Sequence, residues 1–204
     1  MVGDESWKKL TKSVSDWGRK EIQNQVAWIK NNDRHGDPLA LAYATILVAS
    51  ARDVDLQTPN DRDFFKLALE VFFESQNSDG SWPSSGVLFH YPSVGNAYCF
   101  EYELLAQLIS TKSLWDEILR HIDKLSASVD FLFRQAYDLD PGRPGRMLAW
   151  ASGHHLQLEG PESWSTASVY QFLATLDRLL AEGVRRHVFQ EFRDRIQGTD
   201  RLCP

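Results

Sequence analysis

The spacing of apolar residues constrains this chain most, because it follows the repeat of an α-helix and no segment shows the sustained alternation of a β-strand. Near the N-terminus, four apolar residues are spaced three, four and three positions apart, which places them on one helix face. They are Trp7, Leu10, Val14 and Trp17. A similar pattern runs through residues 114–136. We therefore predict an all-α chain with about six main helices.

Clusters of Gly, Pro, Asn and Asp separate the predicted helices. Asp37 and Pro38 fit the cap and the first position of a buried helix that extends to about Arg52. The other helices are expected near residues 7–29, 64–73, 96–109, 114–136 and 162–196, the last with Gly183 as a point where it could bend. Residues 77–95 are rich in Ser, Gly and Pro and are predicted to form a long loop, of a length that is usually functional or ordered on the surface.

The composition indicates one globular domain over residues 1–204, either complete or as part of a longer protein. Of the 204 residues, 43% are hydrophobic and 25% are charged, and the net charge of −6 argues against binding to nucleic acid or to an anionic membrane. The longest apolar stretch, residues 38–51, is too short to span a membrane, and the N-terminus has no signal-peptide pattern. Cys99 and Cys203 are far apart and define no disulfide framework. A cytoplasmic protein is therefore expected.

Three segments share one order of residue types. Each has a polar loop, then a helix that begins with small residues, continues with an aromatic residue and ends with aliphatic residues. The segments begin at Asp37, Val94 and Ser163. Helices with one apolar face are predicted between these buried helices, and such an alternation is typical of arrays of helical hairpins. The fold class that we expect is therefore all-α, built from helical hairpin repeats.

The nine residues that end at Pro83, Ser-Gln-Asn-Ser-Asp-Gly-Ser-Trp-Pro, carry a resemblance to a known family. Gln76 to Trp82 resembles the Q-x-x-D-G-S-W motif of the terpenoid cyclase and protein prenyltransferase superfamily, which folds as an α/α toroid. The resemblance implies that Gln76 lies at a helix end with Trp82 close by, and that Asp79 and Gly80 form the turn between them. The segment Glu162-Ser163-Trp164-Ser165 resembles the same motif more weakly. Six helices are half of a complete toroid of twelve, so the resemblance implies an open arc or part of a larger protein.

The catalytic residues of that superfamily are incompletely represented. Class II terpene cyclases use a D-x-D-D acid cluster, whereas this chain offers only Asp138-Leu139-Asp140 in a turn. Protein prenyltransferases bind zinc, for which Cys99 with His90, or the pair His154 and His155, could supply ligands, although no spacing requires it. The histidine pair lies before Glu159 and Glu162, an arrangement that also suits acid–base work, but such pairs are more often polar loop residues. We assign no catalytic residue and no cofactor, with zinc as the alternative.

Aromatic residues in the long loop are the main candidates for binding. Trp82, Phe89 and Tyr91 either anchor a binding surface or fold back onto the helices. The candidate site is completed by five further residues near this loop and near helix starts: His90, Asn96, Glu101, Glu162 and Trp164.

We expect a non-enzymatic protein-binding module with a scaffold or regulatory role. Its partner would be another protein or a further domain of the same polypeptide, with a homo-oligomer as an additional arrangement and no nucleic-acid or membrane partner. The alternative is an enzyme similar to terpenoid cyclases and prenyltransferases, or a protein that binds an apolar ligand in an aromatic-lined cavity. The basic residues around Arg185 and Arg186 are interleaved with acids, which favours a solvated helix face over a docking face.

Overall fold

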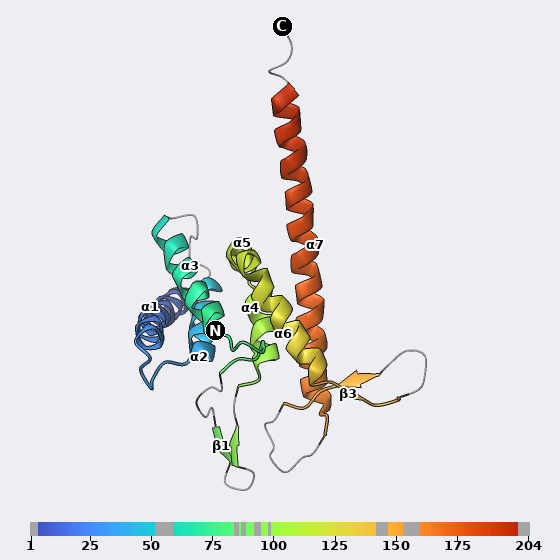
Figure 1. The fold of residues 1–204 in the computed structure, drawn as a ribbon. Helices are drawn as coiled ribbons and strands as arrows, with labels where there is room; N and C mark the ends of the chain where they lie inside the picture. Colours follow the sequence, from blue (N-terminus) through green and yellow to red (C-terminus); the bar gives the residue numbers. More distant parts are fainter. Residues whose placement is uncertain are drawn as a thin grey trace.

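The computed structural model describes residues 4–51, 59–83, 86, 89–91, 95–97, 99–141, 147–152 and 160–199, and most of these are helical (Figure 1). The α-helices are α1 (Asp4–Lys30), α2 (Pro38–Ala49), α3 (Pro59–Glu74), α4 (Glu101–Ser110), α5 (Trp115–Ile118), α6 (Ile122–Arg134) and α7 (Ser163–Thr199). Two 3₁₀ turns, η1 (Lys112–Leu114) and η2 (Leu119–His121), flank α5. The described part of the chain holds six helices of ten residues or more, so the predicted all-α character is confirmed.

Two short antiparallel strand pairs were not predicted. Strand β1 (Phe89–Tyr91) pairs with β2 (Gly95–Ala97), and β3 (Tyr137–Asp138) pairs with β4 (Leu148–Ala149). The predicted helix start at residue 96 is therefore wrong, because residues 95–97 are a strand and α4 begins at Glu101. Strands of two or three residues are too short for alternation of apolar and polar residues to become visible in a sequence.

Two further differences concern helix continuity. The apolar pattern over residues 114–136 predicted one helix, but η2 divides it into α5 and α6. A 3₁₀ turn has fewer residues per turn than an α-helix, so it rotates the helix that follows, and Leu125 and Leu132 of α6 are fully buried while Ile122 is exposed. Conversely, α7 is one continuous helix across Gly183, where the sequence allowed a bend.

Helix α2 forms as the sequence predicted. The Oδ1 atom of Asp37 accepts hydrogen bonds from the backbone N–H groups of Leu39 (2.9 Å) and Ala40 (3.1 Å), and Pro38 occupies the first turn. This cap satisfies two of the donors that a helix start leaves without intrahelical partners. Most of α2 is buried, so its sequence is apolar nearly all round.

The buried helices form a row through the molecule. Helix α2 packs against α1, α3 and α4, and α4 packs against α7. In Figure 1, α1, α2 and α3 gather on one side, and α4 and α6 lie between them and α7. Among the largest fully buried side chains are Leu41 of α2, Phe72 of α3, Leu104 of α4 and Phe172 of α7. One apolar core therefore joins helices that are far apart in the sequence.

The segment Gln76–Trp82 ties the end of α3 to α6. The Nε2 atom of Gln76 lies 2.8 Å from the hydroxyl of Ser128 and 3.0 Å from the carbonyl of Lys124, and it also reaches the carbonyl of Gly80 at 3.1 Å. Gly80 has a φ of 89°, and a Cβ atom there would lie 2.2 Å from the carbonyl oxygen of Ala127. A side chain is therefore excluded at this turn by both backbone conformation and close approach.

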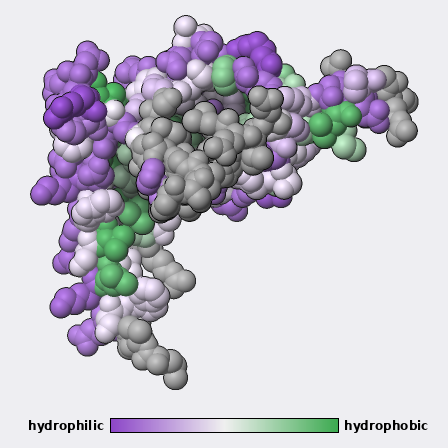
Figure 2. Space-filling model, turned by 90° about the horizontal axis from the view of Figure 1, so that it is seen from below, coloured by the Kyte–Doolittle hydropathy of each residue, from purple (hydrophilic) through white to green (hydrophobic). Residues whose placement is uncertain are grey.

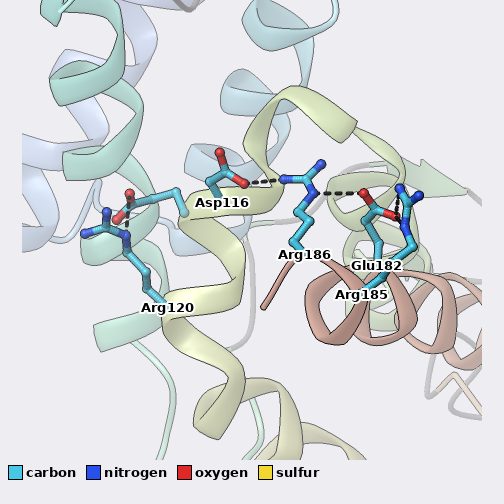
Figure 3. A network of polar contacts seen from close by, with 6 residues as sticks. Asp116, Arg120, Glu182, Arg185 and Arg186 are labelled. Carbon is cyan, nitrogen blue, oxygen red and sulfur yellow. Dashed lines mark hydrogen bonds and ion pairs between the residues drawn. The ribbon is translucent and has the colours of Figure 1, made fainter. Parts of the chain in front are cut away.

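Helix α7 extends beyond the other helices (Figure 1). It contacts η2, and a Cβ atom on Gly183 would lie 3.1 Å from the side chain of Leu119. One helical turn further on, Arg186 bridges Glu182 of its own helix and Asp116 of α5, while Arg185 pairs with the same glutamate (Figure 3). Beyond these contacts, the side chains of residues 185–195 are exposed.

Candidate functional site

The structure places Trp82 in the core and not on a binding surface. Only 7% of the residue is exposed, and its ring stacks on Phe72 with centroids 4.2 Å apart and planes 4° from parallel. Of the two alternatives that the sequence left open for Trp82, the structure agrees with the one in which the loop folds back onto the helices. A buried ring cannot meet a partner unless the fold opens, so Trp82 is a packing residue.

The other loop candidates lie in or beside the β1–β2 hairpin. His90 pairs with Asn96 in the ladder, Phe89 pairs with Ala97, and Tyr91 with Gly95. His90 is exposed. The side chains of Phe89, Tyr91 and Asn96, like His154 and His155, lie outside the described residues.

Glu101 and Glu103 lie at the start of α4 and differ in exposure. Glu101 is partly buried, and this burial raises the pKa of its carboxyl group, whereas Glu103 is exposed. Residues two apart point to different sides of a helix, which accounts for this difference. Burial makes ionisation of Glu101 less favourable than in water.

Glu162 and Trp164 hold the start of α7 in place. The Oε2 atom of Glu162 accepts hydrogen bonds from the backbone N–H and the hydroxyl of Ser152, the former at 3.1 Å. Trp164 contacts Phe100 edge to face, with centroids 5.4 Å apart. These contacts connect the segment at residues 147–152 and α4 to α7, so both residues have structural contacts in addition to any binding role.

A groove between α1 and α2, which also reaches Cys99 and the α4 residue Gln107, combines apolar and polar groups. Its volume is about 450 Å³. Apolar residues dominate its lining, and they are Trp17, Leu39, Ala40, Tyr43, Ala44, Ile46 and Leu47. The polar lining residues are Glu21, Asp37, Cys99 and Gln107, and none of the described lining residues is basic. We call this hollow the Trp17 groove.

The protonation state of the Cys99 thiol limits the chemistry that the Trp17 groove can support. The Sγ atom of Cys99 lies 3.5 Å from the hydroxyl of Tyr43. Burial raises the pKa of Cys99 to about 11, and the carboxylates of Glu101 and Asp37 add to the increase. Burial likewise raises the pKa of Tyr43. Both groups are therefore protonated near neutral pH, and a protonated thiol is a poor nucleophile and a poor metal ligand.

The zinc alternative finds no support in the residues that can be placed. In the described part of the chain, no group of three or more His, Cys, Asp and Glu side chains is arranged to hold a metal ion. Cys99 and His90, which the sequence analysis considered together, do not form such a group.

The apolar face predicted near the N-terminus is exposed along the first half of α1, which the sequence did not indicate. It consists of Trp7, Leu10, Val14 and Trp17, and we call it the α1 stripe. Trp7 is 61% exposed and Trp17 is 60% exposed. Seen from below, the first part of α1 extends from the body as an arm, with hydrophobic residues along it (Figure 2). Helical spacing alone predicts such a face but not what covers it, so no signal in the sequence separated this stripe from a buried one.

A second exposed apolar stripe lies on the outer part of α7. Val184, Val188 and Phe192 are spaced four residues apart, and Phe189 lies beside them. Phe192 is 62% exposed and Val188 is 57% exposed. The alternating charges around Arg185 and Arg186 dominate this part of the sequence and do not indicate the apolar residues between them. We call them the α7 stripe.

Comparison with protein-family models, with curated proteins and with solved structures gives no significant match for this chain. Within the described residues, every helix is either too short or too polar to cross a lipid bilayer. The resemblance of Gln76–Trp82 to the toroid motif therefore rests on these residues and on their packing.

Proposed function

We propose that the chain is a non-enzymatic helical module that binds a protein partner through the α7 stripe. The observation that carries this proposal is the exposure of Val188 and Phe192 on a helix whose first half is in the core. Large apolar side chains that gather on one exposed helix face are typical of helix-mediated protein contacts. The partner surface would be an apolar groove or a second amphipathic helix.

The base of the α7 stripe is held by contacts that fix its direction. The bridge from Arg186 to Asp116 lies where α7 leaves the body (Figure 3), and Gly183 approaches Leu119 at the same level. A helix held in this way presents its outer face without first having to fold, which reduces the entropy lost on binding.

The half-toroid arrangement remains our proposal for the finer fold class. It is supported by the row of α2, α4 and α7. Helices α2 and α7 begin as two of the three similar segments predict, whereas the small residues of the Val94 segment lie in β2 and α4 begins only at Glu101. It is also supported by Gln76 at the end of α3, by the turn at Gly80 and by Trp82 packed on that helix. In this arrangement, α7 is the last helix of the row, so a partner could contact the outer half of α7 on the side away from α4.

Site-specific photo-crosslinking in cells tests the proposed binding face. A benzophenone amino acid replaces Val188 on the stripe or, as the matched control, Gln190 on the other side of the helix. We expect an adduct of defined mass from position 188 and little from position 190. Equal labelling from both positions, or none from position 188, would count against the proposal.

The Trp17 groove favours a second candidate function, the binding of an apolar small molecule. Its volume of about 450 Å³ and its mainly apolar lining suit such a ligand. Native mass spectrometry of the gently purified chain tests this alternative, because a stoichiometric small-molecule adduct would support it. A chain that carries no adduct would leave the protein-binding module as the better account.

A further inference from the structure

We infer that two copies of the chain pair through the α1 stripe, with their α1 helices antiparallel and Trp7 of one copy opposite Trp17 of the other. This inference concerns a different face from the α7 stripe and does not depend on the proposed partner of that stripe. Four observations carry it: the symmetry of the spacing, the lack of charge along the seam, the neighbouring groove and the exposed area.

The spacing of the α1 stripe reads the same in both directions. Tryptophan stands at each end, aliphatic residues stand between them, and the intervals are three, four and three residues. A two-fold axis level with residue 12 therefore brings Trp7 opposite Trp17 and Leu10 opposite Val14. In the heptad notation, the residues alternate between positions a and d, and antiparallel pairing faces each a with a d of the other helix. The surface is thus self-complementary, as a two-fold interface requires.

Between residues 6 and 18, the residues that flank the stripe carry no charge. On a helix, the positions beside this seam are those of Ser6, Thr11, Ser13 and Gly18. The charged residues between positions 5 and 17 lie around the opposite face, and they are Glu5, Lys8, Lys9, Lys12 and Asp16. Two copies can therefore approach along the stripe itself without like charges meeting there.

The Trp17 groove offers a place for the indole of the second copy. Trp17 lines this groove beside Tyr43 and Leu47, and antiparallel pairing places Trp7 of the second copy next to Trp17. Helix α2 approaches α1 closely at this level, because a Cβ atom on Gly18 would lie 2.6 Å from Val48. The incoming ring would thus pack into an apolar hollow of about 450 Å³ that α1 and α2 already form.

The exposed area fits a small but specific interface. Each aromatic side chain contributes up to about 250 Å² when covered, so two tryptophans exposed by 61% and 60%, with Leu10 and Val14, offer roughly 400 Å² per copy. A standard interface buries about 800 Å² per partner. The stripe alone therefore supplies about half of that area, so we expect a dimer of low affinity.

Sedimentation velocity of the full chain over a wide concentration range tests this pairing. We expect a monomer–dimer equilibrium for the wild type, and Leu10→Asp should raise the dissociation constant at least ~100-fold, because a carboxylate would enter the apolar seam. Lys12→Asp, on the opposite face of the same turn, and Phe192→Asp, on the α7 stripe, should leave the equilibrium within about threefold of wild type. Leu10 is exposed, so circular dichroism should show an unchanged fold in all three variants.

Disulfide trapping tests the direction of pairing. Cys203 is replaced by Ser, Cys99 being buried, and a tagged Leu10→Cys chain is mixed with an untagged Val14→Cys chain. Antiparallel pairing predicts the mixed disulfide in excess over either same-site product, whereas an excess of same-site products would overturn the antiparallel arrangement. A monomer at every concentration, or a dimer that Leu10→Asp leaves intact, would overturn the inference itself.

Discussion

The side-chain amide of Gln76 lies 2.8 Å from the fully buried hydroxyl of Ser128, and this contact joins the end of α3 to the middle of α6. The same amide reaches the carbonyl of Lys124 in the preceding turn. A single glutamine therefore bonds to two polar groups of α6, the carbonyl of Lys124 and the hydroxyl of Ser128, which lie 48 and 52 residues from it in the sequence.

Replacing Gln76 by Ala should lower the free energy of unfolding by about 1–3 kcal/mol, because Ser128 would lose its partner inside the core. Urea unfolding followed by circular dichroism measures the change. Gln171→Ala, on an exposed part of α7, is the matched control and should have an effect below about 0.5 kcal/mol. Equal stability of the two variants would show that the Gln76 contacts contribute nothing.

Gly80→Ala should destabilise the protein more than Gly160→Ala. Both glycines have positive φ values, 89° and 125°. A Cβ atom at position 80 would lie 2.2 Å from the Ala127 carbonyl, whereas one at position 160 meets nothing within 4 Å. Conformational strain alone predicts a loss of about 1–3 kcal/mol at position 160, and the collision at position 80 adds to it. Thermal unfolding of the two variants checks the order, and the opposite order would contradict the described packing.

Trp82→Ala should remove about 3–5 kcal/mol of stability, because it leaves a cavity beside Phe72. Trp82→Phe should lose less than Trp82→Ala, since a ring can still stack and the indole N–H has no hydrogen-bond partner among the described residues. Chemical denaturation of the three proteins measures the series. A small effect of Trp82→Ala on stability would contradict the packing role of Trp82 and make it a candidate binding residue again.

His121 should make stability sensitive to mildly acidic pH. Its ring stacks on Phe73, with centroids 4.7 Å apart, and its Nε2 atom is buried without a partner in the described part of the chain. Burial lowers the pKa of His121 below the usual 6.5, and the nearby carboxylates of Glu117 and Asp123 offset only part of this effect. The unfolded chain therefore binds a proton that the folded chain does not, so stability falls as the pH drops through 6.5 towards the lowered pKa.

The free energy of unfolding, measured by urea titration between pH 8 and pH 5, checks this expectation. The free energy of unfolding of the His121→Gln variant should fall less steeply over this interval than that of the wild type. The His187→Gln variant, changed at an exposed position on α7, should follow the wild-type curve. Parallel curves for wild type and His121→Gln would show that His121 does not cause the acid sensitivity.

Much of the fold could be predicted from local sequence. Asp37 and Pro38 define the start of α2, because capping depends only on residues within one turn. The turn at Gly80 follows in the same way from Asp-Gly and its neighbours. The break between α5 and α6 could not be predicted, because a 3₁₀ turn leaves the apolar spacing almost unchanged while it rotates the next helix.

The candidate site was predicted less well, because exposure depends on the whole fold. Trp82 stands in a polar loop and yet is buried, since the loop folds onto Phe72. Trp7 has the helical spacing of a core residue and yet is exposed, since the first half of α1 extends past the body. Aromatic residues serve cores and surfaces alike, and only the packing of distant helices decides between them.

The continuity of α7 has a mechanical consequence. Phe172 and Leu179 lie in the core, and the α7 stripe begins at the next turn of the same unbroken helix. A helix with uninterrupted backbone hydrogen bonds has no hinge, so a sideways load at its outer end acts as torque on its inner half. Displacement of Phe192 would therefore be transmitted directly to the packing of Phe172 against Tyr102, with the contact at Leu119 as the fulcrum.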